Sequence, residues 1–173
     1  MHELAMTVAG GCRAVRVVAF HVMRRVTIAD DLVAGTTLVV VHNPDPPAPT
    51  EWTLHCEGIA ERRAEIRGVV VLAHGPEPNA RQRHELAEAW AGTPPPVAVM
   101  TRSTIVRGAL TALNWFMANR LEPFSEYDFA GAFAYVRVPE GQRAHVLASM
   151  RKLAAALGVT VAAERKSPNA PPT

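Results

Sequence analysis

Short apolar runs alternate with longer amphipathic stretches along most of the chain. Residues 37–42, 69–73 and 97–100 are almost free of polar side chains. Runs of this length, rich in β-branched residues, are typical of strands covered on both faces of a sheet. Between and after these runs, apolar residues recur at helical spacing. This spacing predicts helices over residues 51–66, 80–90, 104–117, 126–136 and 140–157.

A further strand is predicted before residue 37. Residues 20–28 alternate apolar and polar side chains, which is typical of a half-solvated strand. Asp30, Asp31 and Gly35 supply turn chemistry between this segment and the next apolar run. We therefore expect an antiparallel hairpin at the start of the sheet.

A last, short strand completes the predicted fold. Residues 122–125 suit an edge position, because Pro123 has no N–H to donate to a neighbouring strand. The predicted fold class is α/β: a mixed, mostly parallel sheet, opened by an antiparallel hairpin, with helices packed on the sheet. A single domain over residues 20–157 accounts for this pattern. Residues 1–19 are a leader of uncertain structure, and residues 158–173 are expected to form a disordered tail.

Helix ends and buried faces follow from the same pattern. We expect Asn79 and Ser125 to cap helices and Gly68 to end the first helix. The side chains expected to face inward are Trp52, His55, Cys56, Ile59, Leu86, Ala87, Trp90, Ile105, Ala109, Ala112, Leu113, Phe116, Phe129, Ala132, Phe133, Val146, Leu147, Met150, Leu153, Ala154 and Leu157. The charged residues expected to face mainly outward are Glu61, Arg62, Arg63 and Glu65.

Composition narrows the classes of function. The 173 residues carry a net charge of +2 and show no basic run with interleaved aromatics, so no nucleic-acid partner is expected. No apolar run approaches the roughly 18 residues of a membrane span, so no membrane insertion is expected either. Cys12 and Cys56 do not make a disulfide framework, which favours a reducing compartment and a cytoplasmic location.

The turn before the predicted helix at residues 104–117 carries the clearest candidate chemistry. It reads Thr101-Arg102-Ser103-Thr104, and Arg107 follows one turn into the helix. A helix N-terminus presents N–H groups and a partial positive charge, which suit an anionic small ligand or an acidic side chain of a partner. The alternative is a capped helix whose arginines are only solvated.

Two histidines end predicted parallel strands. His42 and His74 belong at the carboxyl edge of the sheet, where open α/β sheets bind ligands, so both are candidates for the rim of a site. Their spacing matches no metal motif, and no metal is predicted. Cys56 falls on a buried helix face, where a thiol is inert, and the chain has no Gly-x-Ser-x-Gly elbow or phosphate-cradling glycine loop. No catalytic residue and no cofactor are therefore predicted.

Three stretches of the chain carry a family resemblance. They read LVVVHNPDPPAPTEW, GVVVLAHGPEPNARQRHEL and VAVMTRSTIVRGALTALNWF, within residues 38–116. Together they resemble the bacterial STAS-like domains (anti-sigma-factor-antagonist-like, or STAS/SEC14), and the resemblance covers residues 20–157. The most specific pieces are Glu51-Trp52, Gln82-Arg83 and Val106-Arg107-Gly108.

The resemblance implies a class of function. STAS-like domains are generally non-enzymatic, and they bind a partner protein or regulate a transporter or a phosphorelay. In regulated members a partner kinase phosphorylates a serine in an Asp-Ser-Ser-Gly-like turn, but residues 75–80 contain no Ser or Thr. The first hypothesis is therefore a non-catalytic regulatory or protein-interaction module, which is also compatible with a homodimer. The alternative is a small-ligand or lipid-binding domain that uses the carboxyl edge of the sheet.

Overall fold

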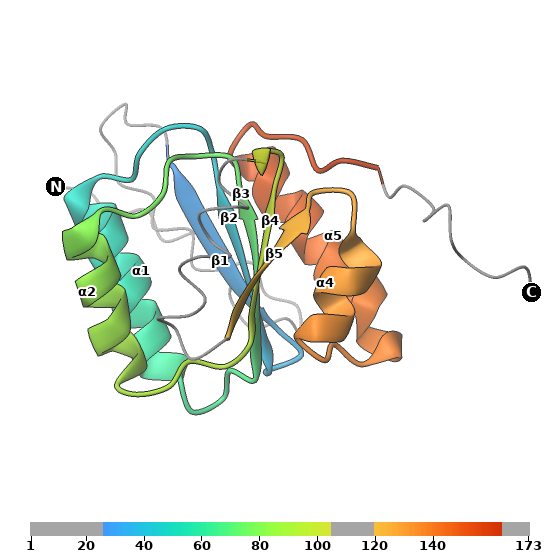
Figure 1. The fold of residues 1–173 in the computed structure, drawn as a ribbon, viewed down its shortest axis with the longest axis horizontal. Coiled ribbons are helices and arrows are strands. Elements are labelled where there is room, and N and C mark those ends of the chain that lie inside the picture. Colours follow the sequence, from blue (N-terminus) through green and yellow to red (C-terminus); the bar gives the residue numbers. More distant parts are fainter. Residues whose placement is uncertain (1–25, 105–119, 164–173) are drawn as a thin grey trace, which may run out of the picture.

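A mixed five-stranded sheet forms the centre of the molecule (Figure 1). The computed structural model describes residues 26–104 and 120–163. Its strands are β1 (Ile28–Val33), β2 (Thr37–His42), β3 (Gly68–Ala73), β4 (Val97–Thr101) and β5 (Leu121–Ser125). Its helices are α1 (Pro49–Arg62), α2 (Ala80–Trp90), α4 (Phe129–Tyr135) and α5 (Glu140–Ala156). The strands lie in the order β1-β2-β3-β4-β5, with β1 antiparallel to β2 and the other pairs parallel. The predicted α/β class is confirmed.

The helices form two layers, one on each face of the sheet. Figure 1 shows α1 and α2 on one side and α4 and α5 on the other. Alternate side chains of β2 serve the two layers: Leu38 and Val40 pack with α1, whereas Val39 and Val41 pack with the opposite layer. Two buried clusters result. Strand β2 carries apolar side chains on both faces because a layer of helices covers each face.

The parallel register brings the ends of β2 to β5 to one edge of the sheet. His42 pairs with Ala73, Leu72 pairs with Met100, and Thr101 pairs with Ser125. We call this side the carboxyl edge. The loops that follow these four strands therefore begin next to one another, although they are far apart in the sequence.

The predicted hairpin exists, but its first strand lies later in the chain than expected. Gly35, at φ +72°, lies in the turn, as predicted. Asp30 and Asp31 were expected in that turn and instead lie within β1. Residues 20–25 of the predicted strand lie outside the described residues. The turn interpretation was wrong because both carboxylates have partners on distant helices, which a local pattern does not reveal.

Two helix boundaries also differ from the prediction. Helix α1 ends at Arg62, and Gly68 is the first residue of β3 rather than a helix stop. A Cβ at Gly68 would lie 2.7 Å from the Val136 carbonyl oxygen, so close packing explains this glycine. Helix α4 is capped by Asp128, whose side chain accepts a hydrogen bond from the Gly131 N–H. Ser125 is the last residue of β5 instead.

Most of the predicted inward faces are confirmed among the described residues. Trp52, His55, Cys56 and Ile59 are all buried on α1. On α2 the phase was partly wrong: Ala87 is exposed, and Ala89 is the buried alanine. The inward faces predicted on α4 and α5 lie in the core cluster that covers the second face of the sheet.

Several predictions fall outside the described residues. They concern the leader at residues 1–19, the part of the helix predicted at residues 104–117 that follows Thr104, including Arg107, and residues 164–173 of the predicted tail. The first residues of the predicted tail do lie in the structure. Val159 and Val161 there pack against the core beside α5.

Candidate functional site

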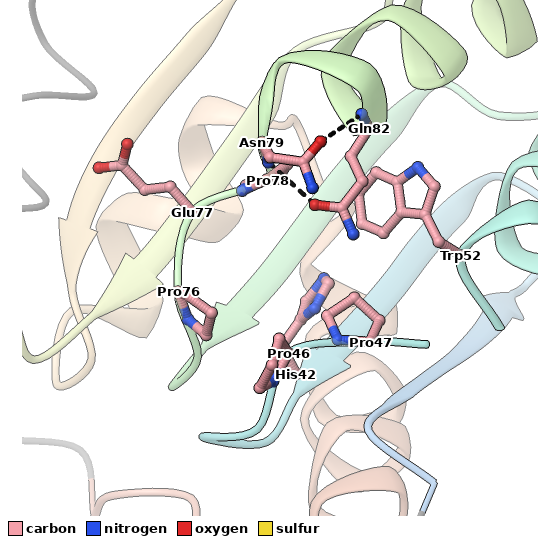
Figure 2. Close-up of a pocket in the computed structure, with 9 residues that line it drawn as sticks. All are labelled: His42, Pro46, Pro47, Trp52, Pro76, Glu77, Pro78, Asn79 and Gln82. Atoms are coloured by element: carbon pink, nitrogen blue, oxygen red, sulfur yellow. Dashed lines mark hydrogen bonds between the residues drawn. The ribbon is translucent and has the colours of Figure 1, made fainter. Parts of the chain in front are cut away.

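The carboxyl edge holds a small pocket between the loops that follow β2 and β3 (Figure 2). Its volume is about 150 Å³. Four prolines form much of its wall: Pro46 and Pro47 from the first loop, Pro76 and Pro78 from the second. Proline fixes φ and loses little conformational freedom when a ligand binds, so this wall is rigid before any partner arrives.

Asn43 shapes the first loop and lies against the second. Its side-chain nitrogen donates to the Val26 carbonyl, and its Oδ1 accepts from the Asp45 N–H at 2.9 Å. The Asn43 carbonyl meets the second loop at Gly75, where a Cβ would lie only 2.5 Å from that oxygen. Gly75 is therefore required by a close approach between the loops.

Glu51 fixes the start of α1 relative to β1. Its carboxylate accepts hydrogen bonds from the Thr27 N–H and hydroxyl, both at 2.6 Å, and from the Ile28 N–H at 3.0 Å. Trp52, the next residue, is buried and lines the pocket. The Glu51-Trp52 pair thus combines an anchor with a wall of the pocket.

A polar network lies behind the pocket. The His42 ring lies 6.4 Å from the Trp52 ring and 6.5 Å from the His55 ring, measured between centroids. His55 Nδ1 lies 2.8 Å from Asp30 Oδ2, and Arg62 donates to Asp30 Oδ1 at the same distance. Arg62 was expected to face mainly outward and is instead half-buried against this carboxylate.

Burial sets the protonation of this network. It lowers the pKa of His42 to about 3, with a smaller contribution from the charge of His55. Burial raises the pKa of Asp30, but its hydrogen bonds and ion pairs with His55 and Arg62 outweigh this, and the pKa is lowered overall. His42 is therefore a neutral imidazole at physiological pH, and its backbone carbonyl accepts a hydrogen bond from the His74 N–H at 3.3 Å.

The opposite wall of the pocket is the N-terminus of α2. Asn79 Oδ1 accepts from the Gln82 N–H at 3.0 Å, and Gln82 Oε1 accepts from the Asn79 N–H at 2.9 Å. This reciprocal capping box fixes which end of each carboxamide is oxygen and which is nitrogen. Figure 2 shows the Gln82 amide nitrogen on the side of Pro47 and His42. The predicted cap at Asn79 is confirmed, and the Asn-x-x-Gln spacing was the signal that could have identified Gln82.

A second polar cluster lies farther along the carboxyl edge. Glu126, after β5, is fully buried, and its Oε2 accepts from Arg102 Nε at 2.5 Å. Among the described residues, Glu126 Oε1 and His74 Nε2 are buried without hydrogen-bond partners. Burial lowers the pKa of His74, Arg102 lowers it further, and Glu126 opposes both. Glu126 was not predicted from the sequence, because only the fold brings it beneath Arg102.

The predicted site residues separate into two groups. His42 lines the pocket, whereas His74 lies with Arg102 and Glu126. Thr101 is buried, and its Oγ1 accepts a hydrogen bond from the Ser103 N–H at 3.3 Å. Thr104 follows this turn and is helical. An anion at this turn would contact the Arg102 guanidinium, which is already paired with the Glu126 carboxylate. The predicted contribution of Arg107 lies outside the described residues.

Comparisons with known proteins add no family assignment. No family model matches the chain, and no curated protein or solved structure shows significant similarity to it. Within residues 26–104 and 120–163, no group of three metal-ligating side chains gathers. No helix in the same part of the chain has the length and apolar character needed to span a membrane.

Proposed function

We propose that this chain is a non-catalytic regulatory module of the STAS-like type that binds a partner protein through the carboxyl edge of its sheet. The observation that carries the proposal is the preformed pocket between the two proline-containing loops, with the neutral His42 at its wall. Rigid surfaces with unused hydrogen-bonding groups bind partners at low entropic cost. A cytoplasmic location accords with the buried free thiol of Cys56, whose pKa burial raises to about 11.

The size of the pocket separates this proposal from its alternative. A site for a lipid or another drug-sized ligand occupies roughly 300–1,000 Å³ and encloses most of the ligand. The pocket at the carboxyl edge offers about 150 Å³. That volume suits one or two residues of a protein segment, and it favours an interaction module over a lipid-binding domain.

The turn at residues 101–104 supplies a second contact in this proposal. Arg102 is mostly exposed, so it can meet an acidic side chain of the partner or a small anion while it remains above Glu126. Phosphate titrated against the wild type, Arg102→Ala and Arg107→Ala proteins tests this contact. Lower affinity in both variants is expected, and equal affinities would contradict it.

Photo-crosslinking at two matched positions tests the proposed function. A photoreactive amino acid replaces either Glu77, exposed at the carboxyl edge, or Arg67, exposed before β3 at the opposite edge. In the cell that makes this protein, the proposal expects one defined product from position 77 and none from position 67. Products from neither position, or only from position 67, would refute it, and a product twice the mass of the chain would identify a second copy as the partner.

A further inference from the structure

Glu126 is a buried charge whose counter-charge lies at the surface. Its side chain is 1% exposed, whereas the Arg102 side chain paired with it is 61% exposed. Glu126 Oε2 accepts the hydrogen bond from Arg102 Nε, and Oε1 is buried without a hydrogen-bond partner among the described residues. A buried carboxylate is costly unless it is paired, and one that loses its counter-charge tends to take up a proton. The charge of Glu126 therefore depends on what meets Arg102 from outside.

Three consecutive parallel strands bring this cluster together at the carboxyl edge. His74 follows β3, Arg102 follows β4 and Glu126 follows β5. The three side chains act on one another: burial lowers the pKa of His74, the charge of Arg102 lowers it further, and Glu126 opposes both. Within the described residues, Tyr127 is the other titratable group that acts on Arg102. The cluster thus holds two buried groups that can accept a proton beneath one exposed cation.

Arg102 can bind an anion while it stays on Glu126. Within the described part of the chain its hydrogen bond to Glu126 uses Nε, which leaves the two terminal NH₂ groups of the guanidinium to meet an anionic group. One guanidinium then serves two negative charges, of which one is fully buried. A proton taken from the solvent by the Glu126 carboxylate removes that excess of negative charge.

We propose that anion binding at Arg102 is coupled to proton uptake by the buried carboxylate of Glu126. The ligand is an anionic group, either a carboxylate of the partner or a small oxyanion. Because the bound state holds more protons than the free state, affinity should rise as the pH falls, by at most about tenfold per pH unit for one proton. This inference rests on the proposed function and adds a form of regulation to its second contact.

Sulfate is the probe, because it keeps both of its charges from neutral to mildly acidic pH. Isothermal titration calorimetry of the full chain, in two buffers of different ionisation enthalpy, gives the affinity and the number of protons taken up. We expect proton uptake, tighter binding at the lower pH, and a shift of the Glu126 carboxyl carbon in NMR spectra toward its protonated position. A blocked peptide with one glutamate forms the second arm: a matching response identifies a partner carboxylate as the ligand, and a response to sulfate alone identifies a small oxyanion.

Glu126→Gln is the decisive variant, since it keeps the shape of the side chain and removes its charge. It should bind sulfate several-fold more tightly than the wild type at neutral pH, because no carboxylate shares the guanidinium, and it should take up no proton. Glu85→Gln is the matched control. It also removes a carboxylate from an arginine pair, that of the exposed Arg81, and it should keep the sulfate affinity and the proton uptake of the wild type.

Several outcomes would overturn the inference. They are an absence of sulfate binding, an affinity that does not change with pH, and equal proton uptake in the wild type and in Glu126→Gln. Uptake that persists in Glu126→Gln and is lost in His74→Gln would overturn it as well, because the proton would then belong to His74. If position 77 cross-links to a partner while sulfate binding shows no coupling, this inference fails and the proposed function stands. If the coupling is present and no partner cross-links at position 77, the coupling holds and the proposed function fails.

Discussion

Asp30 and Asp31, adjacent in β1, bind helices on opposite faces of the sheet. The Asp30 carboxylate meets His55 and Arg62 of α1 at 2.8 Å each. The Asp31 carboxylate accepts a hydrogen bond from the Ser149 hydroxyl of α5 at 2.6 Å. Because successive strand residues point to opposite faces, this pair ties one edge strand to both helical layers.

Ser149→Ala tests the bond to the α5 layer. The hydroxyl is nearly buried and donates to a charged group, so its loss should lower the free energy of unfolding by about 1.5–3 kcal/mol. Urea denaturation measures the change. In an Asp31→Ala background the same substitution should cost much less, because the acceptor is already gone; equal costs in both backgrounds would show that the bond contributes nothing.

Gly75→Ala should destabilise the protein and disturb the pocket. The added methyl group would lie 2.5 Å from the backbone oxygen of Asn43, so one of the two loops must move. We expect a loss of about 1–3 kcal/mol, together with changed NMR signals from both loops. Gly141→Ala in α5 is the control, since no heavy atom lies within 4 Å of its added methyl group and stability should be unchanged or slightly higher. Similar losses in the two variants would contradict the packing argument.

His42 should make stability depend on pH. Burial lowers its pKa from 6.5 to about 3, so between these values the unfolded chain binds a proton that the folded chain does not. Stability is therefore unaffected above the unfolded pKa and falls as the pH drops below it, by up to about 1.4 kcal/mol per pH unit. Unfolding measured between neutral and mildly acidic pH should show a shallower fall in His42→Gln than in the wild type.

The exposed His84 provides the control for this pH dependence. It lies on α2, with Nε2 3.4 Å from Glu88 Oε1, and three quarters of its side chain is exposed. His84→Gln should retain the slope of the wild type. Parallel slopes in wild type and His42→Gln would show that His42 is not held neutral by the fold.

Arg102 should stabilise the fold through its ion pair with Glu126. Its removal leaves the fully buried carboxylate without the one ion-pair partner it has in the described part of the chain, so Arg102→Ala should lower the melting temperature. Adding Glu126→Gln should recover part of the loss, because the buried side chain is then neutral. A double variant no more stable than Arg102→Ala would contradict this coupling, and thermal denaturation of the four proteins completes the cycle.

The elements of the fold could be predicted from local pattern, because their burial repeats with a fixed period. The apolar run of β2 and the inward face of α1 both follow from such periods. Asp30 and Asp31 could not be placed, since acidic pairs are common in turns and only distant partners hold them in a strand. Sequence-based reasoning thus succeeded where one segment determines the outcome.

The candidate site was only partly predictable for the same reason. His42 and His74 were placed at the carboxyl edge correctly, because the end of each apolar run marks the end of its strand. The pocket itself depends on the close approach of Gly75 to Asn43, which belong to loops from different parts of the chain. The burial of Glu126 likewise could not be predicted from its neighbours in the sequence, because its ion-pair partner Arg102 lies 24 positions away.

The last helix of the described chain covers the first strands. Helix α5 packs on β1 and β2, and its Ser149 meets Asp31 across 118 positions of sequence. During synthesis, the apolar face made by Val39, Val41 and Val70 therefore stays open until α5 has left the ribosome. Apolar surface of this kind is what chaperones cover on nascent chains. We expect a chain that ends before residue 140 to aggregate rather than persist as a smaller folded unit.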